Sequence, residues 1–215
     1  MALAGPGGRG SRWRVCRRTA SRYRLASVNT TRFLLIRHGE STWNAAGRWQ
    51  GQGDPSLSPR GREQAARLAA ELADEGIEMI VASDLARAAE TAAILGDALG
   101  LAPGRDERLR ELDVGRWTGL TRGEIEGTDR ARLEHFERGG SEARAGGGEC
   151  RCEIGDRVRS TVAEIAEGSS GRCVAIVTHL GVVRALLAGA ELGNAEWRRI
   201  TADELASRAS RGAGS

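Results

Sequence analysis

Short apolar segments alternate with longer segments of helical periodicity along most of this chain. Three apolar segments, residues 32–36, 77–82 and 172–177, have the length and composition of strands buried on both faces. Ser58 followed by Pro59 is typical of a helix start, a cap and then proline at the first helical position. The apolar spacing predicts helices over residues 59–76, 85–99, 129–137 and 154–167, with another starting at 182–187. Strands alternating with helices indicate an α/β fold, a three-layer α/β/α sandwich with a mostly parallel central sheet.

The charge of the chain is unevenly distributed. Residues 1–32 contain eight arginines and no acid, so the remainder carries 32 − 8 = 24 basic against 29 acidic residues, a net charge of −5. A mildly acidic body argues against a nucleic-acid partner. We therefore expect an Arg-rich extension over residues 1–30, one domain over 31–200, and a C-terminal tail over 201–215. No apolar run is long enough to cross a bilayer, so no membrane association is expected.

The four cysteines, at positions 16, 150, 152 and 173, follow no disulfide-framework or zinc-site spacing. A structural zinc site needs four ligands, and His135 is not placed to complete one with Cys150 and Cys152. We expect free thiols in a reducing cytosol, hence a cytoplasmic protein without a bound metal.

Chemically active residues follow the predicted strands. His38 comes directly after the first strand, flanked by Arg37 and Gly39, and His179 follows the strand at 172–177. Ligands bind at the carboxyl ends of parallel strands, so these residues should converge at one edge of the sheet. Phosphoryl transfer needs a nucleophile, positive charge around the phosphoryl oxygens and an acid for the leaving oxygen. Imidazole and guanidinium groups supply the first two, and Gly39 permits a close backbone approach to a ligand.

Ordered motifs extend this pattern over roughly residues 32–190. They are 35–44 (LIRHGESTWN), 47–51 (GRWQG), 57–61 (LSPRG), 83–92 (SDLARAAETA), 109–119 (LRELDVGRWTG) and 177–187 (VTHLGVVRALL). A single Arg-His-Gly triplet has little value, whereas ordered blocks at strand and helix junctions are specific. In this order they resemble the histidine phosphatase superfamily, whose fold is that of phosphoglycerate mutase.

The resemblance implies a role for each matching residue. His38 would be the phosphorylated nucleophile, and Glu111 the acid that protonates the leaving oxygen and then activates water. Arg37, Arg87 and His179 would surround the phosphoryl oxygens. Further contacts to substrate or phosphate are expected from Asn44, Gly39, Gln50 and Gly51. Viewed from the residues alone, Arg87 also fits an ion pair on a helix surface, and Glu111 an exposed carboxylate.

The chain departs from the family pattern at three places. Leu180 stands where a second glycine usually follows the histidine, which would narrow or stiffen the phosphate rim. Cys150 replaces a serine after Glu149, and we expect Glu149 to support the site rather than to contact substrate. Nothing beyond Leu192 resembles the usual closing strand, so residues 199–215 are expected to form either a short helix or a loose end.

The most specific interpretation is a phosphomonoester hydrolase that acts through a phosphohistidine on a small phosphorylated substrate, without cofactor or metal. A homodimer is compatible with this interpretation. The main alternative is a mutase that returns the phosphoryl group to another hydroxyl. The short segment between Gly119 and Gly146 argues against it, because mutases of this family tend to carry a longer insertion there. A non-catalytic phospho-ligand-binding protein is the second alternative, although it would have no need to keep both His38 and Glu111.

Overall fold

A single five-stranded sheet forms the centre of the computed structural model, which describes residues 30–212. The strand order is β3-β2-β4-β1-β5. Four strands run parallel to their neighbours, and β5 pairs antiparallel with β1. The strands are β1 (Arg32–Arg37), β2 (Met79–Ala82), β3 (Gly104–Arg105), β4 (Cys173–Thr178) and β5 (Trp197–Thr201). The predicted extension over residues 1–30 lies outside the described residues except for Thr30.

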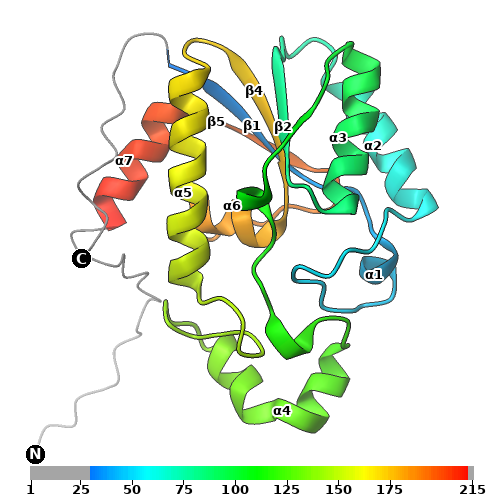
Figure 1. Cartoon of the computed structure of the whole chain (residues 1–215), viewed down its shortest axis with the longest axis vertical. Coiled ribbons are helices and arrows are strands. Elements are labelled where there is room, and N and C mark those ends of the chain that lie inside the picture. Colours follow the sequence, from blue (N-terminus) through cyan, green and yellow to red (C-terminus); the bar gives the residue numbers. More distant parts are fainter. Residues whose placement is uncertain (1–29, 213–215) are drawn as a thin grey trace, which may run out of the picture.

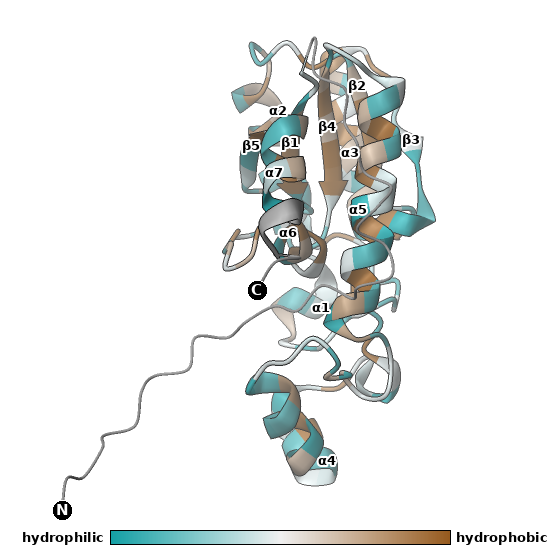
Figure 2. Cartoon of the chain, turned by 90° about the vertical axis from the view of Figure 1, so that its left-hand side faces the viewer, coloured by the Kyte–Doolittle hydropathy of each residue, from teal (hydrophilic) through white to brown (hydrophobic). Residues whose placement is uncertain are grey.

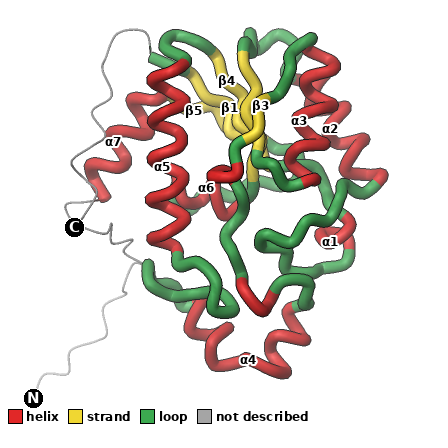
Figure 3. The backbone as a smooth tube through the Cα atoms, in the orientation of Figure 1, coloured by secondary structure: helices red, strands yellow, loops and turns green. Residues whose placement is uncertain are grey.

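Helices cover both faces of this sheet, which confirms the predicted three-layer arrangement (Figure 1). On one face lie α2 (Pro59–Glu71) and α3 (Ala86–Leu99). On the other lie α5 (Arg151–Gly168), α6 (Leu180–Leu186) and α7 (Ala202–Gly212). Figure 3 shows the strands enclosed between these two groups of helices. The chain also forms α1 (Thr42–Ala45), α4 (Arg122–Glu137) and 3-10 turns at Glu107–Leu109 and Gly115–Trp117.

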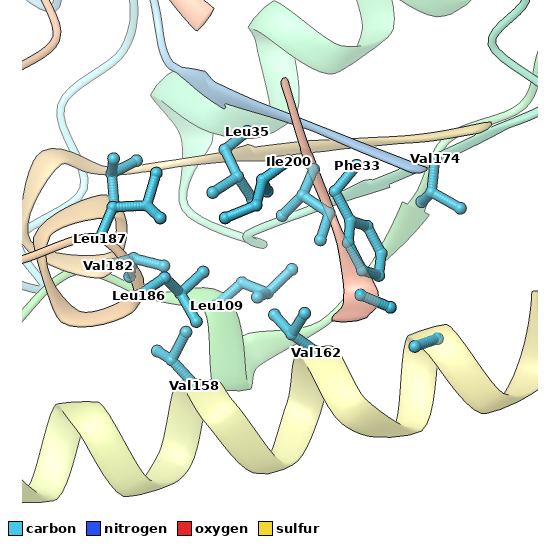
Figure 4. Close-up of a cluster of buried hydrophobic side chains, with 14 of the residues drawn as sticks. Phe33, Leu35, Leu109, Val158, Val162, Val174, Val182, Leu186, Leu187 and Ile200 are labelled. Carbon is cyan, nitrogen blue, oxygen red and sulfur yellow. The ribbon is translucent and has the colours of Figure 1, made fainter. Parts of the chain in front are cut away.

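Strand β1 is apolar along its length because both of its faces are covered. Phe33 and Leu35 pack with α5, α6 and α7, and Figure 4 shows them facing Val158 and Val162 of α5. Leu34 and Ile36 point the other way and pack with α2 and α3. In the hydropathy colouring of Figure 2, the central strand β4 is brown, whereas the helices around it mix teal and brown segments. Side chains alternate between the faces of a strand, so a strand between two helical layers needs apolar residues at every position.

The sequence placed the start of helix α4 differently from the structure. Helix α4 begins at Arg122 rather than near Asp129, because Thr121 and Glu124 form a capping box ahead of it. Asp129, where the predicted helix starts, has φ −146° and ψ 36° and marks a kink between two helical segments. Helix α2 starts at Pro59 as expected, and the Ser58 hydroxyl accepts a hydrogen bond from the Gly61 backbone N–H at 3.0 Å.

The chain does contain a closing strand, contrary to the expectation that none follows Leu192. Strand β5 is an edge strand whose one buried residue is Ile200, while Arg198 and Arg199 are exposed. Edge strands often carry charged residues, so β5 lacks the apolar run by which buried strands are recognised in sequence. Residues 202–212 form helix α7, the first of the two expected alternatives, and Ala202 and Leu205 pack against the core.

The expectation of free thiols is wrong for Cys150 and Cys152, which form a disulfide at the start of α5. Their Cα atoms lie 5.4 Å apart, which is within reach of such a bond. Cys173 is a free, buried thiol as expected, and Cys16 lies outside the described residues. None of the helices in the described chain is long and apolar enough to cross a membrane.

The contribution of β5 can be measured with Ile200→Ala. Ile200 is 4% exposed and pairs with Phe33 of β1. Removing this buried side chain should lower the free energy of unfolding by about 2–5 kcal/mol in urea denaturation. Arg198→Ala, an exposed position on the same strand, should change it by less than about 0.5 kcal/mol. Equal effects of the two substitutions would contradict the packing of β5 against the core.

Candidate active site

The parallel pairing of β1 and β4 brings the two histidines together. Arg37 lies opposite Thr178 at the ends of these strands, and the His38 backbone N–H donates to the Thr178 carbonyl at 2.9 Å. His38 and His179 are the next residues of each strand, and their ring centroids are 5.1 Å apart. The predicted convergence at one sheet edge is therefore what the structure has.

His38 is held in the state that a nucleophile requires. Its Nδ1 lies 2.7 Å from the Gly39 carbonyl oxygen, which can only accept, so Nδ1 carries the hydrogen and Nε2 keeps its lone pair. Burial, together with the positive charges of Arg87 and Arg37, lowers the pKa of His38 to about 3. The ring is therefore neutral at physiological pH, and it lines a cavity of about 1180 Å³.

Two arginines line the same cavity beside His38. Arg87 is fully buried and donates to the Gly53 carbonyl at 2.7 Å and the Gly51 carbonyl at 2.8 Å. Arg37 donates to the Leu192 carbonyl at 2.7 Å. Among the described residues, neither guanidinium forms an ion pair, and the Nε of each is buried without a hydrogen-bond partner. Burial lowers the pKa of Arg87 to about 10, so it remains charged at neutral pH.

These contacts decide against the surface ion pair as an interpretation of Arg87. Carbonyl oxygens orient its guanidinium without cancelling its charge, so the charge remains available to an anion that enters the cavity. Isolated buried charges are costly, and a bound anion would offset that cost.

His179 is fully buried next to His38 but is not part of the cavity wall. Within the described chain neither of its ring nitrogens has a hydrogen-bond partner. Burial and the charge of Arg87 place its pKa well below the usual value, so the ring is neutral. A neutral imidazole still has one N–H to donate.

Glu111 lines the cavity and contacts the first turn of α6. Its Oε1 accepts a hydrogen bond from the Leu112 N–H at 2.8 Å and its Oε2 one from the Gly181 N–H at 3.2 Å. A Cβ atom at Gly181 would lie 2.1 Å from Glu111 Oε1, so only glycine leaves room for the carboxylate. The Thr178 hydroxyl donates to the Leu109 carbonyl at 2.8 Å and ties this segment to β4.

The remaining predicted residues divide into two groups. Gln50 and Gly51 line the cavity, and Gln50 accepts a hydrogen bond from the Ser41 hydroxyl at 2.7 Å. Asn44 and Gly39 do not line it. Asn44 caps α1, and its Oδ1 accepts from the Ser41 N–H at 3.1 Å and from Asn194 at 3.2 Å.

The sequence predicted that Gly39 allows a ligand to approach the backbone closely. In the structure, Gly39 allows the backbone of Gly61 to approach instead. A Cβ atom there would lie 2.5 Å from the Gly61 carbonyl oxygen. Glu149 matches its expected supporting role: it accepts from the Asp113 N–H at 3.0 Å and pairs with Arg157 at 2.7 Å.

Besides the residues with predicted roles, several others contribute to the site. Asn194, at the start of the turn before β5, donates to the His38 carbonyl at 3.2 Å. The Thr91 hydroxyl accepts from the Gly39 N–H at 3.1 Å and donates to the Arg87 carbonyl at 2.7 Å. Trp49 belongs to the cavity wall, whereas Trp117 is a core residue. Leu180, the substituted glycine position, lines the cavity, as do Arg151 and Arg184.

Comparison with known proteins agrees with this geometry. Residues 33–209 match the family model of the histidine phosphatase superfamily, branch 1. The chain belongs to the histidine phosphatase superfamily. It is 38% identical to glucosyl-3-phosphoglycerate phosphatase of Mycolicibacterium vanbaalenii, over 79% of this chain and 84% of that protein. Phosphoserine phosphatase 1 of Hydrogenobacter thermophilus is 34% identical over 72% of this chain and 74% of the relative.

Solved structures of superfamily members share the fold. A mycobacterial glucosyl-3-phosphoglycerate phosphatase in complex with VO3 aligns with a TM-score of 0.73 at 34% identity, covering 78% of this chain and 90% of that one. Bacillus stearothermophilus YhfR aligns with a TM-score of 0.75 at 31% identity, covering 79% and 90%. These relatives confirm the family, the fold and the prediction of a phosphomonoester hydrolase.

The contact between Gly181 and Glu111 can be tested by Gly181→Ala. The added methyl group should displace the carboxylate and lower kcat for an alkyl phosphate by about 10-fold to 100-fold, because general acid catalysis depends on position. Gly123→Ala in α4, where a Cβ atom would meet nothing within 4 Å, is the matched control and should keep full activity. An active Gly181→Ala enzyme would show that Glu111 does not need its present position.

The neutral state of His38 predicts a pH-dependent stability. The unfolded chain binds a proton at His38 near pH 6.5, whereas the folded protein does so only near pH 3, so stability falls as pH decreases between these values. At pH 5 this linkage is worth about 2 kcal/mol. Wild type should therefore lose about 2 kcal/mol relative to His38→Gln between pH 8 and pH 5 in urea unfolding. Parallel pH profiles of the two proteins would contradict a buried neutral His38.

Proposed function

We propose that this protein hydrolyses phosphomonoesters of small metabolites through a phosphohistidine formed on Nε2 of His38. One observation carries the proposal: a neutral imidazole, with its Nδ1 hydrogen committed to the Gly39 carbonyl, lines a cavity beside two buried guanidinium groups. Nucleophile and cationic partners are thus already oriented in the free protein. The relatives named as phosphatases of small phosphorylated metabolites support the proposal.

In the first step, Nε2 of His38 attacks phosphorus and the bond from phosphorus to the ester oxygen breaks. Arg37 and Arg87 stabilise the charge on the equatorial phosphoryl oxygens, and His179 donates its N–H to one of them. The protonated carboxyl of Glu111 gives its proton to the leaving alkoxide. A phosphoryl oxygen near His179 would also satisfy a ring nitrogen that has no partner in the described chain.

In the second step, the Glu111 carboxylate takes a proton from water as the water oxygen attacks phosphorus. The bond from phosphorus to Nε2 breaks, inorganic phosphate leaves, and His38 returns to its neutral form. One carboxyl group serves both steps, as acid and then as base. We further propose that no metal takes part, because positive charge is already supplied by the two arginines. Among the described residues the one group with metal-ligand spacing is Glu142, Cys150 and Cys152, which lies outside the cavity wall.

Glu111→Gln tests the intermediate and the role of Glu111 together. With p-nitrophenyl phosphate, whose leaving group needs no proton, the variant should release a burst of nitrophenol and then stall as the phosphoenzyme. Acid quenching of labelled enzyme should show acid-labile, alkali-stable phosphate at His38. Alkyl phosphates should be slowed by about 10²-fold to 10⁴-fold, and His38→Asn should lower turnover by about 10³-fold or more.

The same assays separate hydrolysis from phosphoryl transfer within the substrate. Wild type should release inorganic phosphate and alcohol in equal amounts, and EDTA should not change the rate. An isomeric phosphate ester in place of free phosphate would identify a mutase. A Salmonella relative that is 34% identical is named as a probable phosphoglycerate mutase. Label on serine, aspartate or cysteine would contradict the proposal.

A further inference from the structure

The cavity is much larger than a phosphoryl group, and its wall extends well beyond the catalytic residues. Its remaining wall comes from the end of α4 and residues 139–141, from the first turn of α5, and from α6 with residues 188–189. In Figure 1 the start of α5 and helix α4 lie beyond the same end of the sheet as α6. The wall therefore contacts whatever group is esterified to the phosphate.

This part of the wall is cationic although the protein body is acidic. Five arginines and two glutamates line the cavity: Arg37, Arg87, Arg138, Arg151, Arg184, Glu111 and Glu137. Two of the arginines and Glu111 belong to the phosphoryl site. Three arginines and Glu137 remain, and Glu137 is paired with Arg122. Excess positive charge in a concave site, on a body with a net charge of −5 outside residues 1–32 (24 − 29), indicates an anionic ligand.

Arg151 is the best positioned of these arginines. Its guanidinium carbon lies 4.3 Å from the centroid of the Phe136 ring, which is 8% exposed, so α4 supports the charged group from one side. The Cys150–Cys152 disulfide brackets Arg151 within the first turn of α5. An arginine fixed by an aromatic ring and by a cross-linked backbone loses little entropy when it binds an anion.

Arg184 lies on α6, one turn after the Gly181 that contacts Glu111. Its guanidinium nitrogen donates to both carboxylate oxygens of Glu191 at 2.6 Å. The Glu191 side chain is 73% exposed and that of Arg184 44%, so this pair is weak and can exchange for a better-enclosed anion. Burial lowers the pKa values of Arg37 and Arg151, and the positive charge of Arg184 lowers both further, so Arg184 lies within electrostatic reach of both.

We propose that Arg151 and Arg184 bind a second anionic group of the substrate, so that the enzyme selects phosphomonoesters that carry a carboxylate or a further phosphate. This inference rests on the proposed function, because it concerns the substrate of the same cavity. A guanidinium fork can bind two oxygens of a carboxylate or of a phosphate, so the shared chemistry is a second anion at a distance from the scissile phosphate. Arg138 has a side chain that is 69% exposed and is not assigned a role.

The test compares two pairs of substrates that differ in the second anion. One pair is 3-phosphoglycerate and glycerol 3-phosphate, and the other is fructose 1,6-bisphosphate and fructose 6-phosphate. Wild type should have a higher kcat/KM for the doubly anionic member of at least one pair. Arg151→Met and Arg184→Gln should each raise KM for that member by about 10-fold to 100-fold with little change in kcat, because they remove binding shared by ground state and transition state.

The singly anionic substrates and p-nitrophenyl phosphate provide the internal reference. Their KM in both variants should stay within about 3-fold of wild type, since they lack the group that the arginines bind. Arg159→Met is the matched control: it removes the same charge from α5, two turns further along and outside the cavity wall, and should behave as wild type. Arg151→Lys keeps the charge and should recover part of the preference.

The outcomes also separate this inference from the proposed function. Equal losses on all substrates, or unchanged KM values in both variants, would overturn the second-anion site. So would a wild-type enzyme that hydrolyses p-nitrophenyl phosphate through His38 with no preference in either pair. Absence of phosphatase activity on every substrate, including p-nitrophenyl phosphate, would overturn the proposed function itself. The pair that responds to Arg151→Met identifies carboxylate or phosphate as the second anion.

Discussion

The parallel pairing of β1 with β4 determines where almost every other part of the site lies. With Arg37 opposite Thr178, both histidines leave the sheet at the same level and their rings meet at 5.1 Å. The Thr178 hydroxyl then holds the carbonyl of Leu109 and with it the segment that carries Glu111. Because β1 and β4 pack on both faces, a one-residue shift in their register would exchange side chains between two closely packed cores, which is strongly disfavoured.

Stability and activity are opposed at this sheet edge. Arg87 is fully buried with carbonyl partners and no carboxylate among the described residues, and the His179 ring is buried there with neither nitrogen hydrogen-bonded. Each arrangement costs folding free energy, because a charge or a polar group is withdrawn from water without full compensation. In the proposed mechanism, the positive charge and the N–H groups in return need no rearrangement when phosphoryl charge develops. Burial and the nearby charges of Arg87 and Arg37 also lower the pKa of His38, which keeps its ring neutral, as the proposed nucleophile requires.

Two close backbone approaches make this compact geometry possible. Gly39 lies against the Gly61 carbonyl, which allows the chain after His38 to pass directly over the start of α2. Gly181 leaves room for the Glu111 carboxylate at the start of α6. Replacement of a second glycine by Leu180 is compatible with the site because Leu180 contributes a side chain to the cavity wall instead of crowding Glu111.

The sequence by itself determined the layers and the central strands, and it singled out the residues to which the proposed mechanism assigns the chemistry. Burial on both faces leaves a continuous apolar signature, and His38, Arg87, Glu111 and His179 stand in ordered motifs at element boundaries. The tertiary structure decided the features that leave no local pattern in the amino-acid sequence. Strand β5 carries charges because it is an edge, and the disulfide depends on how the chain turns into α5. The carbonyl partners of Arg87 and the Arg151–Phe136 contact join segments distant in sequence, and only packing decides which of many charged residues face one cavity.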